Sequence, residues 1–416
     1  MHRSAGMQEG RRGSQVAVLD TIHGAAVIAR KMVERGWRAE AFEIYHHTPD
    51  LSSFDLIVSP VHLSPRNPAL EMSRREGKAV ITHHQAVGKL LRQDAAARDI
   101  FEVTGTHSKT TTALLLAVIL SRHRKVLSHT TRGLEIWQDG GSTILQKGLS
   151  IAPANIIRAM QAAEDGGASL ICEVSLGGTG LADYGILTSL SGDYMIASGS
   201  KWASTAKLQM LSLAKSGMRF IANRDTRISS DLPFGTGSGI YACSDRLVLG
   251  KEDAKLDLGE DLDFPGYQTA ISAAAAAAHA AGLGCEDIAE ALSGFDGFSG
   301  RMKIHRRGHQ TIFDSSNSGL KARDVQRALD RARGSDLVAV VGEDSKTVCE
   351  GMDIPALSDL LRHRKGELSR LILVGERLQP LAKELGAEPA ADLEEGLEKA
   401  QKSSPKRLLS SVKCFR

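Results

Sequence analysis

The sequence predicts an α/β protein built from three domains. Two observations carry this prediction. Short apolar segments of strand length alternate with segments of helical length along the chain, a pattern typical of parallel sheets covered by helices. With 416 residues, the chain is also long enough to bury two or three separate cores. We place the domains at residues 1–95, 96–300 and 301–416.

Each predicted domain contains its own set of short apolar strands. In the first domain the predicted strands are residues 16–20, 41–45, 56–58 and 79–81. In the second they are residues 101–104, 169–173, 184–188 and 220–222, with helices over 111–121 and 270–281. In the third they are residues 311–314, 337–341, 371–374 and 408–409. The alternation with helices predicts a mainly parallel sheet in each domain.

The composition excludes several classes of protein. A net charge of +3 and an aromatic content of 4% disfavour nucleic acid as a partner. The five scattered cysteines form no C-x-x-C pair, which argues against a disulfide framework and a structural zinc site. No apolar run approaches the roughly 20 residues that a membrane helix needs, and residues 1–15 lack an apolar signal core. We therefore expect a cytoplasmic protein without membrane insertion.

The segment Thr104 to Thr110 has the features of a phosphate-binding loop. An apolar strand leads into Thr-Gly-Thr-His-Ser-Lys-Thr, and a helix follows. Backbone amides at such a turn and helix N-terminus point at anionic oxygens, while Lys109 adds a positive charge. The Thr110 hydroxyl is available to Mg²⁺. The strict Gly-x₄-Gly-Lys-Ser/Thr pattern is not met, because Val103 and Ser108 occupy its glycine positions.

A carboxylate in the second domain completes a predicted metal site. Glu173 ends an apolar strand, and the carboxyl ends of parallel strands line the ligand crevice of an open α/β sheet. Carboxylate oxygens are ligands that Mg²⁺ prefers. Together with the loop upstream, Glu173 indicates a Mg²⁺-nucleotide site rather than an exposed strand end.

The loop resembles the T-G-T-x-G-K-T-T loop of the Mur ligase superfamily, with Ser108 in place of its second glycine. The resemblance implies that ATP binds at the loop and that Glu173 and Thr110 hold magnesium. It implies that Lys207 is a carbamylated lysine bridging magnesium, with Lys201 in reserve, and that Tyr194 replaces a histidine. The remaining nucleotide contacts that it implies come from Gly105, Thr106, His107, Ser108, Lys109, Thr111, Asn223, Arg301 and Asp314. In this family the arginine reaches the phosphates and the aspartate holds the ribose, so Lys109, Glu173, Lys207 and Arg301 are the expected catalytic residues.

Histidines are concentrated in the first domain, at or near the ends of its predicted strands. We expect His23, His62, His83 and His84 to contact a large polyacidic substrate. Gly178, in the glycine-rich turn after Glu173, is a further candidate because a turn of this kind brings backbone close to a ligand.

The chain from Val16 onward resembles one branch of the superfamily, the coenzyme F430 synthetases. The residues that carry this resemblance lie in the segments 20–24, 59–62, 82–88, 150–153, 173–180 and 204–210. The resemblance implies that ATP phosphorylates a propionate of the nickel tetrapyrrole 15,17³-seco-F430-17³-acid. A carbon of the same macrocycle then attacks the acyl phosphate and closes a carbocyclic ring, with release of ADP and phosphate. Nickel would arrive only as part of this substrate.

Two other functions are compatible with the same residues. One is a Mur-type ligase that joins an amino acid to a carboxylate. The other is a non-catalytic tetrapyrrole-binding protein whose nucleotide loop has decayed, which Ser108 and Tyr194 favour. The oligomeric state does not follow from the sequence.

Overall fold

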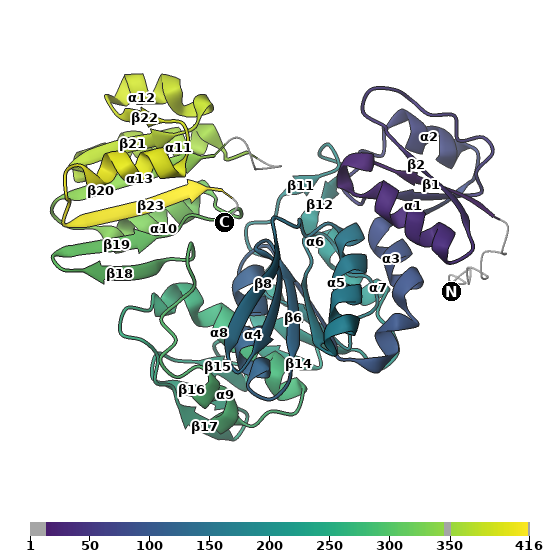
Figure 1. Ribbon diagram of the computed structural model, residues 1–416, viewed down its shortest axis with the longest axis horizontal. Helices are drawn as coiled ribbons and strands as arrows, with labels where there is room; N and C mark the ends of the chain where they lie inside the picture. The colour runs from purple at the N-terminus through teal and green to yellow at the C-terminus, as the bar shows by residue number, and fades with distance from the viewer. Residues whose placement is uncertain (1–13, 345–350, 415–416) are drawn as a thin grey trace. The chain divides into compact units, whose positions relative to one another are not determined.

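The computed structural model describes residues 14–344 and 351–414, and these form an α/β fold (Figure 1). Its contacts divide the chain into two compact units. The first unit contains a four-stranded and an eight-stranded sheet, and the second contains a six-stranded sheet. The predicted α/β class is therefore confirmed, while the predicted domain limits at residues 95 and 300 stay predictions. Among the described residues, no helix is long and apolar enough to cross a membrane.

The N-terminal sheet is parallel and has the strand order β2-β1-β3-β4. Its strands are β1 (Gln15–Leu19), β2 (Arg38–Phe42), β3 (Leu56–Ser59) and β4 (Ala79–Thr82). The helices of this part are α1 (Ala25–Glu34), α2 (Pro68–Arg75) and α3 (His83–Leu91). Because β1 lies inside the sheet, its apolar side chains are fully buried, and the carboxyl ends of β1 and β3 lie at the same edge.

The central sheet has the order β14-β13-β10-β5-β9-β6-β7-β8. Its strands are β5 (Ile100–Thr104), β6 (Val126–Thr130), β7 (Gly133–Gln138), β8 (Gly141–Lys147), β9 (Ser169–Glu173), β10 (Tyr184–Leu187), β13 (Arg219–Asn223) and β14 (Leu232–Phe234). Strands β14 to β6 are parallel, whereas β7 and β8 pair in an antiparallel manner. Strand β5 lies between β9 and β10, which is where strand order changes direction and where ligands bind in open α/β sheets.

Several helices pack around the central sheet, and one of them is buried on nearly all sides. These helices are α4 (Lys109–Ser121), α5 (Pro153–Gly166), α6 (Ala203–Lys207), α7 (Gln209–Ser212), α8 (Phe264–Ala280) and α9 (Cys285–Ala291). Helix α4 follows β5 and is apolar all round, as expected for a central helix. The short strands β11 (Met195–Ile196) and β12 (Lys201–Trp202) form a hairpin, and β15 (Ile240–Ala242), β16 (Arg246–Leu249) and β17 (Glu252–Lys255) form a small sheet.

The six-stranded sheet of the second unit has the order β18-β19-β23-β20-β21-β22. Its strands are β18 (Lys303–Arg307), β19 (Gln310–Asp314), β20 (Leu337–Glu343), β21 (Arg370–Val374), β22 (Glu388–Ala390) and β23 (Arg407–Lys413). Its helices are α10 (Ala322–Ala332), α11 (Ile354–Arg364), α12 (Gln379–Leu385) and α13 (Leu393–Gln401). Only β18 runs antiparallel to its neighbour, and apolar cores lie on both faces of the sheet.

Several strands were misplaced or not predicted, and two of them, β2 and β8, share a physical reason. The strand predicted at residues 41–45 lies instead at Arg38–Phe42, and the strands β6, β7 and β8 were not predicted at all. Strand β2 is an edge strand with charged residues at alternate positions, and β8 is an exposed edge strand. Edge strands need no continuous apolar sequence, because only part of their surface is buried.

The two sheets of the first unit share one apolar core. Side chains of α1, α3 and α5 belong to a single buried cluster that also includes β1 and β9 residues. The contact is tightest at Gly88 of α3, where an added Cβ would lie 1.9 Å from the carbonyl oxygen of Thr179. Thr179 belongs to the turn after β9, so this glycine lets helix α3 of the N-terminal part pack directly on that turn.

We expect Gly88→Ala to destabilise the protein although alanine favours a helix. The new methyl group would displace the Thr179 backbone, and overpacking of this kind typically costs about 1–3 kcal/mol. The matched control is Gly166→Ala at the end of α5, where an added Cβ would meet the Ile136 side chain at 3.7 Å, an ordinary van der Waals distance. Urea denaturation should show a lower free energy of unfolding for Gly88→Ala and a change within about 1 kcal/mol for Gly166→Ala. Equal stability of the two variants would contradict this packing.

Candidate functional site: a phosphate loop beside a histidine-lined face

The phosphate loop joins β5 to α4 and is held against the end of β10. Gly105 has φ 146°, and a Cβ at this position would lie 2.1 Å from the Thr188 hydroxyl. The Thr106 amide donates to the Ser189 carbonyl at 2.8 Å. Thr188 donates in turn to the carbonyl of His107 at 2.5 Å. These bonds fix the loop where helix α4 begins, as the sequence predicts.

Ser108 adopts the left-handed conformation that the family's loop reserves for glycine. Its φ is 62° and ψ is 2°, and its side chain makes no capping hydrogen bond to α4. Its carbonyl accepts the first helical bond, from the amide of Thr112. A non-glycine residue in this conformation costs about 1–2 kcal/mol, so serine supplies the required turn at an energetic cost.

The side chains of Thr110, at the start of α4, and Glu173, at the end of β9, are hydrogen-bonded to each other. The Thr110 hydroxyl donates to Oε2 of Glu173 at 2.8 Å, and the amide of Thr131 donates to the same oxygen at 3.2 Å. Glu173 is 2% exposed, at the carboxyl end of β9. The pairing of Val103 with Glu173 across β5 and β9 sets the Glu173 carboxylate beside the loop that carries the Thr110 hydroxyl. A hydroxyl and a carboxylate beside a phosphate loop are the hard oxygen ligands that suit Mg²⁺.

Lys207 contacts the turn that follows β9, at Ser175, two residues after Glu173. Its Nζ donates to the carbonyl of Ser175 at 2.5 Å and lies 5.8 Å from the ring centroid of Tyr194. The side chain is 1% exposed, which is unusual for lysine. Lys201 is more exposed and lines an open cavity of about 350 Å³ together with residues around Pro60.

The turn after β9 is held by a glutamate that sequence reasoning did not single out. Glu102 is buried in β5 and accepts from the amide of Thr179 at 3.0 and 3.1 Å and from its hydroxyl. Burial raises the pKa of Glu102. Gly178 is packed inside this turn, because an added Cβ would lie 2.8 Å from Met210 Cα and 2.9 Å from a Glu102 oxygen. Its contact with substrate stays a prediction.

The remaining predicted nucleotide contacts are divided between the two units. Thr111 lies buried in α4, and Asn223 ends β13, where its Oδ1 accepts from the amide of Asp225 at 2.9 Å. Arg301 and Asp314 belong to the second unit. Oδ2 of Asp314 accepts from the amide of Gly300 at 2.8 Å and from the hydroxyl of Ser299 at 3.1 Å. Asp314 therefore shapes the turn that precedes Arg301, and its contact with a ribose stays a prediction.

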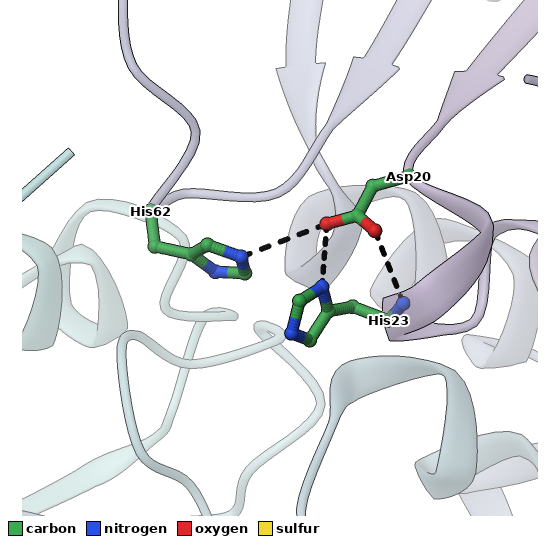
Figure 2. A group of neighbouring side chains, drawn as sticks. All are labelled: Asp20, His23 and His62. Carbon is green, nitrogen blue, oxygen red and sulfur yellow. Dashed lines mark hydrogen bonds and ion pairs between the residues drawn. The ribbon is translucent and has the colours of Figure 1, made fainter. Parts of the chain in front are cut away.

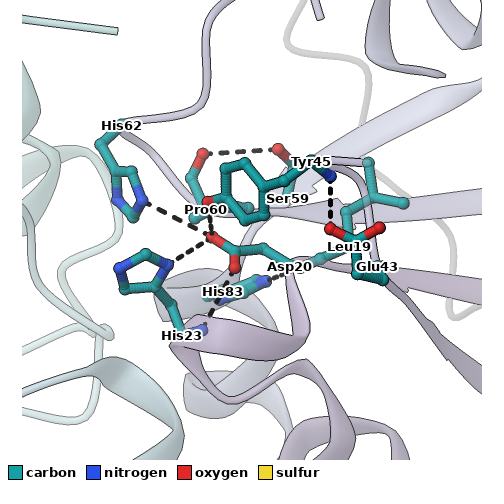
Figure 3. Close-up of polar contacts among 9 residues, drawn as sticks. All are labelled: Leu19, Asp20, His23, Glu43, Tyr45, Ser59, Pro60, His62 and His83. Carbon is teal, nitrogen blue, oxygen red and sulfur yellow. Dashed lines mark hydrogen bonds and ion pairs between the residues drawn. The ribbon is translucent and has the colours of Figure 1, made fainter. Parts of the chain in front are cut away.

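Two of the predicted histidines meet around a carboxylate at the edge of the N-terminal sheet (Figure 2). Nδ1 of His23 lies 2.6 Å from Oδ2 of Asp20, and Nε2 of His62 lies 3.6 Å from the same oxygen. The Tyr45 hydroxyl donates to this oxygen at 2.8 Å (Figure 3). Burial favours the neutral acid, but the two imidazoles and the hydroxyl outweigh it and hold the pKa of Asp20 well below its usual range. The hydrogen bond to Asp20 raises the pKa of His23.

The other two predicted histidines lie deeper, at the start of α3. Nε2 of His83 bonds to the carbonyl oxygen of Leu19 at 2.9 Å. Burial lowers the pKa of His83 to about 4 and that of His84 to about 3, so both are neutral near pH 7. The ring of His84 lies 3.5 Å from the position of a Cβ on Gly177. We call the region of His23, His62, His83 and His84 the histidine-lined face. Through His84 it adjoins the turn that follows Glu173.

Asp20, Tyr45 and Glu102 are the functional-site residues that the sequence prediction missed. Asp20 carried a usable signal, because it ends a buried strand three residues before His23. Tyr45 had no such signal, since it reaches Asp20 from a loop 25 residues away.

Comparison with known proteins agrees with this architecture. A family model described as "Coenzyme F430 synthetase CfbE, C-terminal domain" matches residues 304–414. The coenzyme F(430) synthetase of Methanosarcina acetivorans is 35% identical over an alignment of 467 residues, which covers 97% of this chain and 99% of the relative. The protein of the same name from Methanocaldococcus jannaschii is 24% identical, with coverage of 86% and 90%.

Solved structures of Mur-type ligases share the fold. MurF from Acinetobacter baumannii superimposes with a TM-score of 0.57 at 18% identity, covering 82% of this chain and 79% of that one. A bifunctional folylpolyglutamate synthase/dihydrofolate synthase from Yersinia pestis, in complex with AMPPNP and a Mn ion, gives 0.56 at 16% identity, with coverage of 80% and 90%. With the whole length matched at 35% identity, the chain belongs to the coenzyme F430 synthetase family, and it shares the fold of the MurF structure.

Proposed function

We propose that this protein is an ATP-dependent ligase that makes a carbon–carbon bond. It would activate a propionate of the nickel tetrapyrrole 15,17³-seco-F430-17³-acid as an acyl phosphate and close a carbocyclic ring, giving coenzyme F430. Family membership supports the substrate class. The single observation that carries the nucleotide chemistry is the Thr110–Glu173 pair at the base of the phosphate loop.

The loop and the pair together provide for ATP and magnesium. Backbone amides at the start of α4 and the Lys109 ammonium group would bind the phosphates. Thr110 and Glu173 would hold Mg²⁺, which neutralises charge on the phosphoryl group as it is transferred. The Yersinia pestis protein of the same fold was solved with AMPPNP and a Mn ion, which supports a nucleotide and a divalent cation as ligands of this protein.

The histidine-lined face is our candidate for the substrate side of the site. His23 and His62 are partly exposed there, while His83 and His84 are buried nearby at the start of α3. Because His84 adjoins Gly177, a polyacidic macrocycle on this face would have a carboxylate within reach of the turn after Glu173. We include Gly178 in this turn as a backbone neighbour of the substrate.

The proposed reaction has two balanced steps. A propionate oxygen attacks the γ-phosphorus of ATP, and ADP leaves. A ring carbon of the macrocycle then loses a proton and attacks the acyl carbon, so that a C–C bond forms as the C–O bond to phosphate breaks. Both reacting groups belong to one molecule, and orientation of such groups can supply effective molarities of about 10⁵ M or more. An incoming amine is therefore unnecessary.

Arg301 and Asp314 would contribute from the second unit. An arginine is suited to clamp the charge that develops on the transferred phosphoryl group, because its guanidinium donates two parallel hydrogen bonds. Asp314 would hold the ribose, and Asn223 would contact the nucleotide from β13.

We expect Lys109→Ala to reduce ADP release with the seco-precursor by at least about 100-fold, because the ammonium group that would stabilise the negative charge of the transferred phosphoryl group is lost. Binding of the tetrapyrrole, followed by its visible spectrum, should persist. Lys147→Ala, on the exposed strand β8, is the control and should keep full activity.

The same assay separates the alternative functions. Wild-type protein that releases ADP only when an amino acid is added would be an amine-adding ligase. Tight tetrapyrrole binding without ADP release from any carboxylate substrate would indicate a binding protein.

We expect Ser108→Gly to raise the free energy of unfolding by about 1 kcal/mol, because glycine adopts the left-handed conformation without strain. The KM for ATP should stay the same or fall. Asp139→Gly is the matched control, since Asp139 also has a positive φ (52°) but lies in the β7–β8 turn. A rise in the KM for ATP in Ser108→Gly alone would show that the serine side chain itself contributes to binding.

If Lys207 is carbamylated and bridges magnesium, Lys207→Ala should lose activity and recover part of it when short carboxylic acids are added. The added carboxylate would replace the missing oxygen ligand. Lys201→Ala tests the reserve candidate under the same conditions. Full activity of Lys207→Ala without any additive would remove this residue from the mechanism.

A further inference from the structure

The cluster of Asp20, His23 and His62 has a geometry that hydrogen bonding alone does not explain. One ligand atom from each residue, a carboxylate oxygen or a ring nitrogen, lies within 4.8 Å of the other two. Asp20 follows β1 and His62 follows β3, so neighbouring strands bring them to one edge of the sheet. Figure 2 shows both rings turned toward the carboxylate.

The position of His62 is the observation that most favours a bound ion. Its Nε2 is buried and has no hydrogen-bond partner among the described residues. At 3.6 Å, its separation from Oδ2 of Asp20 is longer than a hydrogen bond. Two ligands of one ion, each about 2.0–2.2 Å from it, lie roughly 3–3.6 Å apart. The spacing therefore fits a shared ion better than a direct contact.

We propose that Asp20 Oδ2, His23 Nδ1 and His62 Nε2 bind one divalent transition-metal ion of the Zn²⁺, Co²⁺ and Ni²⁺ class. Two imidazoles and one carboxylate are the donors that these ions favour, whereas Mg²⁺ prefers oxygen alone. On binding, the hydrogen bond between Asp20 and His23 opens by about half an ångström, and the proton shared there leaves to solvent.

The surrounding residues prepare the cluster for this role. Asp20 is fully buried and has φ 78°, a conformation that aspartate adopts at a cost and that the fold must hold in place. The His23 amide donates to its other oxygen at 3.2 Å. The Tyr45 hydroxyl orients the ligating oxygen, as outer-shell partners of metal ligands commonly do (Figure 3).

The three donors fit an ion that carries no macrocycle. A nickel held by four tetrapyrrole nitrogens has only axial positions left and cannot accept three converging protein ligands. The partly exposed sides of His23 and His62 leave room for a further ligand, such as water or a carboxylate. This site is separate from the Thr110–Glu173 pair, and its existence does not depend on the proposed reaction.

Titration of the metal-free full-length protein, prepared without a histidine tag, with Co²⁺ tests the site. We expect one equivalent to bind and to produce visible d–d absorption, which Zn²⁺ abolishes by displacement. His62→Gln, a substitution at a partly exposed side chain, should weaken binding by more than about 100-fold. Tyr45→Phe should weaken it by about 10- to 100-fold, as is usual for an outer-shell partner.

Two controls separate this site from others on the chain. His47→Gln changes an exposed histidine that pairs with Glu43, and Glu173→Gln changes the proposed magnesium ligand. Both should keep the Co²⁺ spectrum and its one-to-one stoichiometry. The proposal is overturned if the wild-type protein binds no stoichiometric Co²⁺, or if His62→Gln with an unchanged melting temperature binds it as tightly as the wild type.

Discussion

The parallel pairing of β5 with β9 is the constraint on which the candidate site depends. It sets the phosphate loop, which follows β5, beside the carboxylate that ends β9. The Thr110 hydroxyl then meets Glu173 without any long connecting segment. The buried Glu102 of β5 adds a second link, because it holds the turn that leaves β9. A shift of one residue in this register would turn Glu173 away from the loop.

Buried carboxylates organise this half of the protein, and each has its own set of donors. Glu102 is held by the amide and hydroxyl of Thr179, and Glu173 by Thr110 and Thr131. Asp20 is surrounded by imidazoles and a phenol. A buried acid without partners would lose its charge or destabilise the fold. The three acids differ in their partners: Glu102 shapes a turn, whereas Glu173 and Asp20 are the acids that we propose as cation ligands.

Local signals in the sequence were enough to predict the α/β fold and the strand, loop and helix at residues 100–121, while phosphate binding there stays a prediction. The loop is readable because strand, glycine, lysine and helix follow one another within a few residues, and Glu173 because it ends a continuous apolar strand. The role of Tyr45 was not readable, since it depends on a contact with Asp20 across 25 residues. Strand β8 was missed because an exposed edge carries little apolar pattern. The burial of His83 and His84 is likewise a property of the packed α3, not of the His-His sequence itself.

The common core beneath α1, α3 and α5 joins the two large sheets of the first unit. Many of its apolar side chains are fully buried, and exposing each large one would cost about 1.5–3 kcal/mol. The sheet that precedes the histidines and the strand that ends at Glu173 therefore pack on one core, and α3 meets the turn after β9 where Gly88 lies against Thr179. A substitution that changes the volume of a side chain in this core would therefore disturb both the sheet that precedes the histidines and the strand that ends at Glu173.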